Sequence, residues 1–230
     1  PLTERKIRRG TSNFTKAAAM TRQEVLTAVL TGIDAVRVLK DREYRLFTVG
    51  EMGIGNTTTS SAVASVLLQK DPELVTGAGA GLDSAGLKRK TEAIRRGIGL
   101  HHPDPMDGME VLQKVGGFDL AAMAGAFLGG AIYHVPVVID GVIAAAAAAA
   151  AGRIAPAATD YMLAAHVSAE PASIWLLDLI GVTPAIQAGL RLGEGTGALA
   201  LFPLLDMALS IYRDMDTFAE MEIEEYKPLM

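Results

Sequence analysis

The sequence has no cysteine, which excludes disulfides, thiolate metal sites and cysteine nucleophiles. Aromatic residues make up only 5% of the 230 residues, so a base-stacking surface is not expected. Basic residues are fewer than acidic ones, and the net charge of −5 argues against a nucleic-acid binder or a polybasic membrane protein. The most apolar run, residues 142–151, is bounded by Asp140 and Arg153 and is too short to cross a bilayer, which takes about 20 residues. We therefore expect a cytoplasmic protein that binds neither nucleic acid nor membrane.

Half of the residues are hydrophobic, and strand-like and helix-like segments alternate along the chain. Thr21 and Glu24 have the spacing of a capping box, which predicts a helix start. The β-branched run from Val135 to Ile139 is typical of a buried parallel strand. Further strands are predicted at 45–49, 74–75 and 186–192, and helices at 60–68, 87–98, 119–132, after 142, and up to 209.

This alternation predicts an α/β fold, a three-layer α/β/α arrangement with a mostly parallel, Rossmann-like sheet. No linker-like stretch divides the chain, so residues 1–230 are expected to form a single domain. Residues 1–40 and 205–230 are predicted to be peripheral helical parts of it.

Three glycine-rich loops carry the most informative chemistry: GEMGIGNTTTS at 50–60, GAGAGLDSAGLKRK at 77–90 and RLGEGTGA at 191–198. In the first, Asn56 and the threonines after it stand where a helix begins, so free N–H groups and hydroxyls converge as in anion sites. Any one of these loops is as consistent with a plain tight turn as with a ligand site. All three follow predicted strands, however, and the carboxyl ends of parallel strands share the sheet edge where ligands bind.

Other nucleotide and metal chemistries fit poorly. There is no GxxxxGK[ST] sequence for a P-loop, and the glycines at 77, 79 and 81 match only part of a dinucleotide fingerprint. His101 and His102 are adjacent, and neighbours in sequence rarely bind one metal ion. His166 and Glu170 have helical spacing, but Pro171 predicts a loop there. We expect neither a metal site nor a cofactor.

Taken together, several motifs resemble the nicotinate-nucleotide–dimethylbenzimidazole phosphoribosyltransferases of cobalamin biosynthesis, the CobT family. Besides the three loops, these motifs are GGFDLAAMAGAFLGGA at 116–131, PVVIDG at 136–141, HVSAEP at 166–171 and MDTF at 215–218. They occur in the family's order and spacing over nearly the whole chain. Family members usually carry a sizeable N-terminal part before the segment that begins here near Pro1, and we expect this chain to lack it.

The resemblance implies a reaction without metal. An aromatic base, typically 5,6-dimethylbenzimidazole, attacks C1′ of nicotinate mononucleotide, so nicotinate leaves and α-ribazole 5′-phosphate forms with inversion. The leaving pyridinium becomes neutral, so no diphosphate has to be neutralised by magnesium. The enzyme has to hold the phosphate, orient the ribose and take the imidazole proton. The resemblance also implies a homodimer.

The resemblance assigns catalytic roles to Glu194, as the general base, and to Glu51, as a second carboxylate. Partial desolvation by Leu190 and Leu192 is expected to raise the pKa of Glu194 toward useful basicity. The alternatives are an exposed loop carboxylate at Glu194 and a helix N-terminal acid at Glu51.

The expected substrate-binding residues include Lys90 as a phosphate cation, with a solvated helix lysine as the alternative. Asp140 is expected to contact ribose or, equally, to cap a structural element. The full expected binding set is Met52, Gly53, Asn56, Gly79, Ala80, Gly81, Lys90, Asp140, Ser168, Leu192 and Gly193.

One competing hypothesis belongs to another class. The chain is then a nucleotide-binding module, or a truncated inactive form, that binds the donor alone and has no acceptor pocket. A dehydrogenase on a doubly wound fold is a third and weaker interpretation, because no acidic residue ends the next strand at the expected spacing.

Overall fold

The computed structural model describes residues 3–79 and 81–224, and its centre is a small parallel sheet. The strands are β1 (Phe47–Val49), β2 (Val137–Ile139) and β3 (Met162–Ala164), in that spatial order. Val49 pairs with Ile139, and Ile139 with Ala164, so the three strands end level with one another. The prediction of an α/β fold with a parallel sheet is confirmed, and the predicted strands at 45–49 and 135–139 are present in shortened form. The Rossmann-like description and the single-domain division stay predictions.

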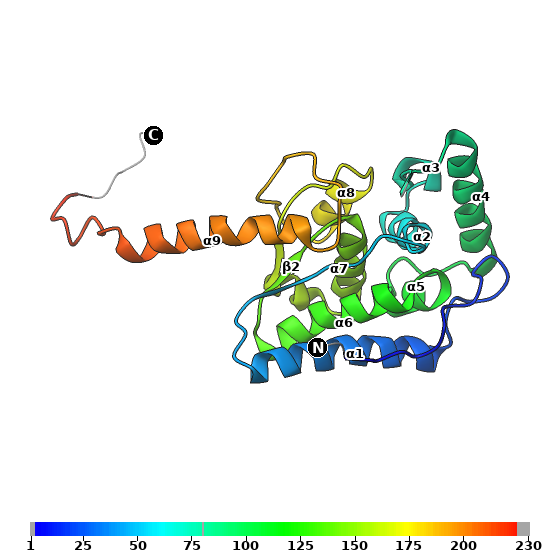
Figure 1. The fold of residues 1–230 in the computed structure, drawn as a ribbon, viewed down its shortest axis with the longest axis horizontal. Helices are drawn as coiled ribbons and strands as arrows, with labels where there is room; N and C mark the ends of the chain where they lie inside the picture. The colour runs from blue at the N-terminus through cyan, green and yellow to red at the C-terminus, as the bar shows by residue number, and fades with distance from the viewer. Residues whose placement is uncertain (1–2, 80, 225–230) are drawn as a thin grey trace.

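Helices surround this sheet (Figure 1). Their bounds are α1 (Arg22–Asp41), α2 (Thr57–Leu68), α3 (Pro72–Val75), α4 (Ser84–His101), α5 (Gly108–Val115), α6 (Phe118–Tyr133), α7 (Val142–Ile154), a 3-10 helix η1 (Pro156–Tyr161), α8 (Ser173–Leu179) and α9 (Thr196–Asp214). The predicted capping box of α1 is confirmed, because the Thr21 hydroxyl accepts the Glu24 N–H at 3.2 Å and the Glu24 carboxylate accepts the Thr21 N–H at 2.8 Å.

The alanine-rich helix α7 is the middle of the core. Every residue from Ile143 to Ala151 is buried, and the helix is in contact with α2, α5, α6, α8 and η1. Alanine side chains allow neighbouring helices to approach on all sides, at little cost in side-chain entropy. The alanine run therefore packs the core.

Helices α1 and α6 lie side by side along one edge of the molecule (Figure 1) and pack very closely. A Cβ added at Gly125 would overlap the backbone carbonyl of Val29, and one added at Gly32 would overlap the carbonyl of Ala122. Only glycine fits at these two crossing points. The helix predicted to begin at Thr21 therefore packs its buried face against α6.

Two predicted strands are wrong. Residues 74–75 belong to α3, because the Asp71 carboxylate caps this short helix by accepting the Glu73 N–H at 2.8 Å, and Pro72 starts it with the required φ. Residues 186–192 form only an isolated parallel bridge between His166 and Ile186. Gly189, with φ of 63°, turns the chain out of the extended conformation before a ladder can continue.

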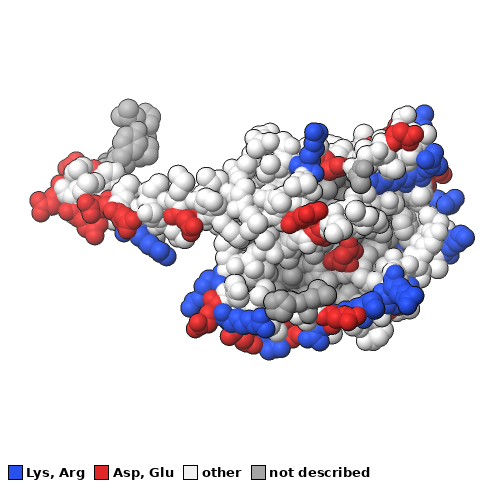
Figure 2. Space-filling view, viewed as in Figure 1, with Lys and Arg blue, Asp and Glu red and all other residues white. Residues whose placement is uncertain are grey.

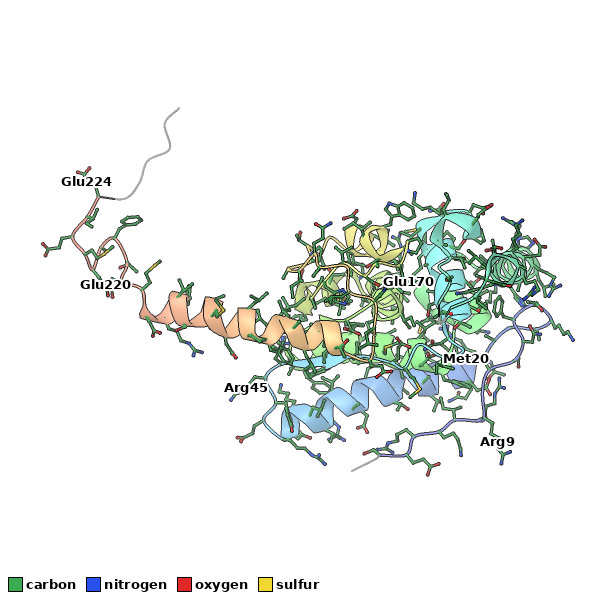
Figure 3. All side chains as sticks on the ribbon, turned by 45° about the horizontal axis from the view of Figure 1, so that its top comes forward. Arg9, Met20, Arg45, Glu170, Glu220 and Glu224 are labelled. Atoms are coloured by element: carbon green, nitrogen blue, oxygen red, sulfur yellow. The ribbon has the colours of Figure 1, made fainter. Side chains whose placement is uncertain are left out.

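Helix α9 leaves the body as an arm (Figure 1). Only its first turns are buried, at Gly197, Ala198 and Leu201, and residues 206–224 are exposed. Acidic side chains gather at the far end of the arm (Figure 2), where Figure 3 places Glu220 and Glu224. Within residues 3–79 and 81–224, none of the helices has the length and apolar content needed to cross a membrane.

Candidate functional site

A cavity of about 170 Å³ lies beside the carboxyl ends of the strands. It collects residues from the loop after β1, from α2, α4 and the start of α7, and from the segments that follow β3 and precede α9. In Figure 3, Glu170 lies within the body of the molecule, close to α2. The lining residues are Glu51, Met52, Gly53, Ile54, Thr57, Ser60, Ser61, Ala64, Val75, Gly79, Lys90, Gly141, Val142, Ile143, His166, Ser168, Glu170, Ala172, Arg191, Leu192 and Gly193.

One end of the cavity is cationic. The Lys90 side chain reaches inward from α4, is 7% exposed, and donates to the Thr57 hydroxyl at 3.0 Å and to the Gly77 carbonyl at 2.9 Å. Burial lowers the pKa of Lys90, and the negative charge of Glu170 opposes this shift. Thr57 opens α2, whose first N–H groups have no acceptor within the helix and carry the positive end of its dipole. Lys90, the N-terminus of α2 and the Gly79 backbone therefore give this end of the cavity the positive character that an anion favours.

Glu51 brings a carboxylate into the same cavity. Its Oε2 accepts the Gly53 N–H and the Asn56 side-chain amide, the latter at 2.6 Å. The Asn56 amide also donates to Asp119 at 2.8 Å, so Asn56 joins two carboxylates. Burial raises the pKa of Glu51, although these two hydrogen bonds oppose the shift. A half-buried carboxylate with a raised pKa can exchange a proton or accept hydrogen bonds from a sugar.

The Glu194 loop adjoins the cavity at Glu51. The Glu194 N–H donates to the Glu51 carbonyl at 3.0 Å, and Leu192 and Gly193 line the cavity. The Glu194 side chain itself is exposed and does not line the cavity. The expected desolvation of Glu194 is therefore wrong, because Leu190 and Leu192 lie beside it in sequence without covering its carboxylate.

Asp140 is a helix cap in this structure. It is 3% exposed, and its two oxygens accept the Gly195 N–H at 2.9 Å and the Ala198 N–H at 2.8 Å, which fixes the start of α9. His166 Nε2 lies 3.6 Å from the same carboxylate. These bonds support the alternative of a structural cap, and Asp140 is not among the residues that line the cavity. Its contact with ribose stays a prediction.

The Asp140–His166 pair has coupled protonation. The Asp140 carboxylate raises the pKa of His166, even though burial opposes the shift. Burial also acts against ionisation of Asp140, but the neighbouring His166 imidazole and hydrogen bonds from the backbone N–H groups of Ala198 and Gly195 lower its pKa. The ionised pair is thus favoured in the folded protein.

The other expected binding residues divide into two groups. Met52, Gly53, Gly79, Ser168, Leu192 and Gly193 line the cavity with Lys90. Asn56, whose amide is bonded to Glu51, and Gly81 are not among the lining residues. The expectation for Ala80 falls outside the described residues.

Several lining residues were missed from the sequence. The loop expected around His166 and Glu170 is present, but it brings both residues into the cavity. Arg191 lines it as well, next to Leu192. His166, Glu170 and Arg191 all belong to the motifs HVSAEP and RLGEGTGA, so the sequence marked them as candidate site residues. Only the tertiary fold shows that they share one cavity with Lys90.

Comparison with known proteins gives the class. A family model described as phosphoribosyltransferase matches residues 1–223, and the chain belongs to this family. A curated relative from Clostridium acetobutylicum, named nicotinate-nucleotide–dimethylbenzimidazole phosphoribosyltransferase, is 49% identical over 225 residues, which are 98% of this chain and 64% of the relative. A relative of the same name from Ruminiclostridium cellulolyticum gives the same identity and coverage. The resemblance to the CobT family is confirmed.

Solved structures agree. The crystal structure of CobT from Thermus thermophilus has a TM-score of 0.90 and 39% sequence identity, with 97% of this chain and 67% of that chain covered. A second Thermus thermophilus structure, named nicotinate-nucleotide–dimethylbenzimidazole phosphoribosyltransferase, has a TM-score of 0.87 and covers 96% of this chain and 65% of that one. The chain spans about 64% of the length of the curated relatives it matches.

Proposed function

We propose that the chain transfers the phosphoribosyl group of nicotinate mononucleotide to 5,6-dimethylbenzimidazole or a related aromatic base. The products are α-ribazole 5′-phosphate and nicotinate, and the reaction belongs to assembly of the cobalamin nucleotide loop. The relatives' names support these substrates. The observation that carries the proposal is that a buried lysine, a helix N-terminus and the Glu51 carboxylate meet in one cavity.

The cationic end suits the donor's phosphate. Lys90 supplies a point charge, and the opening N–H groups of α2 and the Gly79 backbone supply directed donors. The Ser168 hydroxyl lines the same cavity and accepts the Glu170 N–H at 3.3 Å, which leaves its proton for an acceptor on the ligand. We assign phosphate binding to these groups.

The bonds that form and break in the proposed reaction indicate where the general base has to stand. The bond from C1′ to the pyridinium nitrogen breaks and its electrons stay with the nicotinate ring, while one imidazole nitrogen of the acceptor bonds to C1′. The proton that has to leave is on the other imidazole nitrogen, on the edge of the acceptor turned away from the donor. The base is therefore expected at the rim of the donor cavity, which is where the exposed Glu194 stands. Glu51, inside the cavity, is assigned to orienting the ribose.

The backbone at Glu194 also supports this role. Glu194 has a φ of 59°, in the left-handed region that non-glycine residues rarely adopt, between Gly193 at 80° and Gly195 at 78°. Bonds from the Glu194 N–H to Glu51 and from the Gly195 N–H to Asp140 hold this conformation. Such strained positions cluster at functional sites.

Nicotinate release tests the proposal. The protein is incubated with nicotinate mononucleotide and dimethylbenzimidazole, with and without a chelator, and nicotinate is quantified by chromatography. Release in both conditions is expected, and Glu194→Gln should lower turnover by about a hundredfold or more. Glu222→Gln, on the exposed tail, is the matched control and should change nothing. Unchanged turnover in Glu194→Gln would remove Glu194 as the base.

A donor-binding module without an acceptor pocket is the second candidate function, because Lys90, the start of α2 and Glu51 would bind nicotinate mononucleotide whether or not a benzimidazole site adjoins them. Calorimetry would then show nicotinate mononucleotide binding, with no nicotinate release for any benzimidazole, purine or phenol acceptor.

We also propose that the protein is a cytoplasmic homodimer. The arm supports pairing, because apolar side chains on α9 and beyond it, including Leu204, Met207, Ile211 and Tyr212, are exposed. Sedimentation at micromolar concentration should give twice the mass of 24.1 kDa. A monomer at all concentrations would contradict this assembly.

A further inference from the structure

We propose that Arg191 binds the carboxylate on the pyridine ring of the donor and so makes the cavity selective for the acid nucleotide over its carboxamide analogue. The inference rests on the proposed function, because it concerns the donor named there. It assigns a specificity-determining residue to a site whose phosphate end belongs to Lys90.

Charge gives the first step. Among the described residues that line the cavity, the lysine and arginine residues are Lys90 and Arg191. The donor also has two anionic groups, a phosphate and a ring carboxylate. Lys90 is buried on α4 and bonded to Thr57 and Gly77, at the end where the N-terminus of α2 also favours phosphate. The second anion therefore has one remaining lysine or arginine partner in the cavity wall.

The backbone fixes where Arg191 stands. On one side of it, the Leu190 carbonyl accepts the Ala169 N–H at 3.0 Å. On the other side, the Glu194 N–H donates to the Glu51 carbonyl at 3.0 Å. Residues 191–193 thus form a short span of cavity wall, anchored at both ends, between the segment after β3 and the loop after β1. Arg191 is held at the rim, on a different element from Lys90.

The guanidinium of Arg191 is available for a ligand. Arg8, Arg37 and Arg95 are each paired with a carboxylate. Arg191 is exposed, and the ion pairs among the residues that the structure describes do not include it. A guanidinium offers two parallel N–H groups that match a planar carboxylate, whereas a carboxamide has no charge and presents only one acceptor. The contact therefore separates the acid from the amide by charge and by geometry.

Titration calorimetry with three ligands tests the assignment: nicotinate mononucleotide, nicotinamide mononucleotide and ribose 5-phosphate. In Arg191→Gln, we expect the affinity for the nicotinate nucleotide to fall about tenfold, and the other two affinities to stay within about twofold. Arg191→Lys should restore part of the loss. Lys90→Gln should weaken all three ligands alike, and Arg213→Gln, on the exposed arm, should change none.

The outcomes separate the two proposals. An equal loss for all three ligands in Arg191→Gln would mean that Arg191 contacts phosphate, and no loss would mean that it contacts neither group; both results overturn the inference. If the unmodified protein binds none of the three ligands, the donor site itself is refuted. Raising the salt concentration should reduce the discrimination of the unmodified protein, because an exposed charge pair is screened.

Discussion

Replacing Asp140 with alanine should destabilise the protein strongly while leaving the Lys90 end of the donor cavity intact. The Asp140 carboxylate accepts two buried N–H groups, from Gly195 and Ala198, and faces His166. Alanine leaves both N–H groups without an acceptor and removes the charge partner of a buried imidazole. The perturbation therefore acts on the start of α9 and on the Glu194 loop, not on Lys90.

The magnitude follows from burial. An unsatisfied buried N–H costs about 1–3 kcal/mol, and removing one partner of a buried charged pair typically costs about 3–5 kcal/mol. These effects overlap, so we expect a loss of about 3–5 kcal/mol in the free energy of unfolding. A domain of this size has about 5–15 kcal/mol in total, so the variant should still fold at low temperature.

Urea unfolding followed by circular dichroism measures the loss. Asp206→Ala, an exposed acid on the same helix α9, is the matched control and should stay within about 0.5 kcal/mol of the unmodified protein. Calorimetry on folded Asp140→Ala should find the affinity for ribose 5-phosphate, which the Lys90 end of the cavity is proposed to bind, little changed. The reasoning is refuted if stability is unchanged and donor affinity is lost, since Asp140 would then be a ligand-binding residue.

Two further predictions concern stability. The difference in unfolding free energy between the unmodified protein and Asp140→Asn should be largest between about pH 4 and 6.5. The pKa of Asp140 is lowered in the folded protein, so its contribution to stability is lost as the pH falls through that pKa. The pKa of His166 is raised, so its contribution is lost as the pH rises through that pKa. A difference that grows steadily above pH 7 would contradict this sign. Gly125→Ala should cost at least about 1–3 kcal/mol because its Cβ meets the Val29 carbonyl, whereas Gly99→Ala, in open space on α4, should stabilise by about 0.5–1 kcal/mol. Equal melting temperatures for the two glycine variants would contradict the close packing of α1 on α6.

Local patterns predicted much of the fold, because their causes are local. The Thr21–Glu24 capping box fixes the start of α1, and the β-branched run before Asp140 becomes β2. The strand predicted at 74–75 is absent because Asp71 and Pro72 favour the start of a helix more strongly than two apolar residues favour a strand. The strand predicted at 186–192 is absent because the positive φ of Gly189 interrupts an extended run that would otherwise pair with the segment after β3.

The site was predictable in its parts, but not in its assembly. The glycine loops and Lys90 indicated an anion site, and the structure brings Gly79 and Lys90 to the start of α2. The role of Asp140 depends on a bond to Gly195, 55 residues away, which no sequence period reveals. The exposure of Glu194 likewise depends on what packs around it in space. Sequence neighbours alone suggested that it was covered.

The central claim is that Lys90, Gly79 and the N-terminus of α2 hold the phosphate of a nucleotide in the cavity that contains Glu51. Backbone amide NMR during titration with nicotinate mononucleotide tests it directly. The account predicts that the Thr57, Gly79 and Gly193 amides shift together with one dissociation constant, which Lys90→Gln weakens, while Gly99 on the outer face of α4 does not move. Saturable shifts confined to residues outside the cavity, or no shifts at Thr57 and Gly79, would contradict the claim.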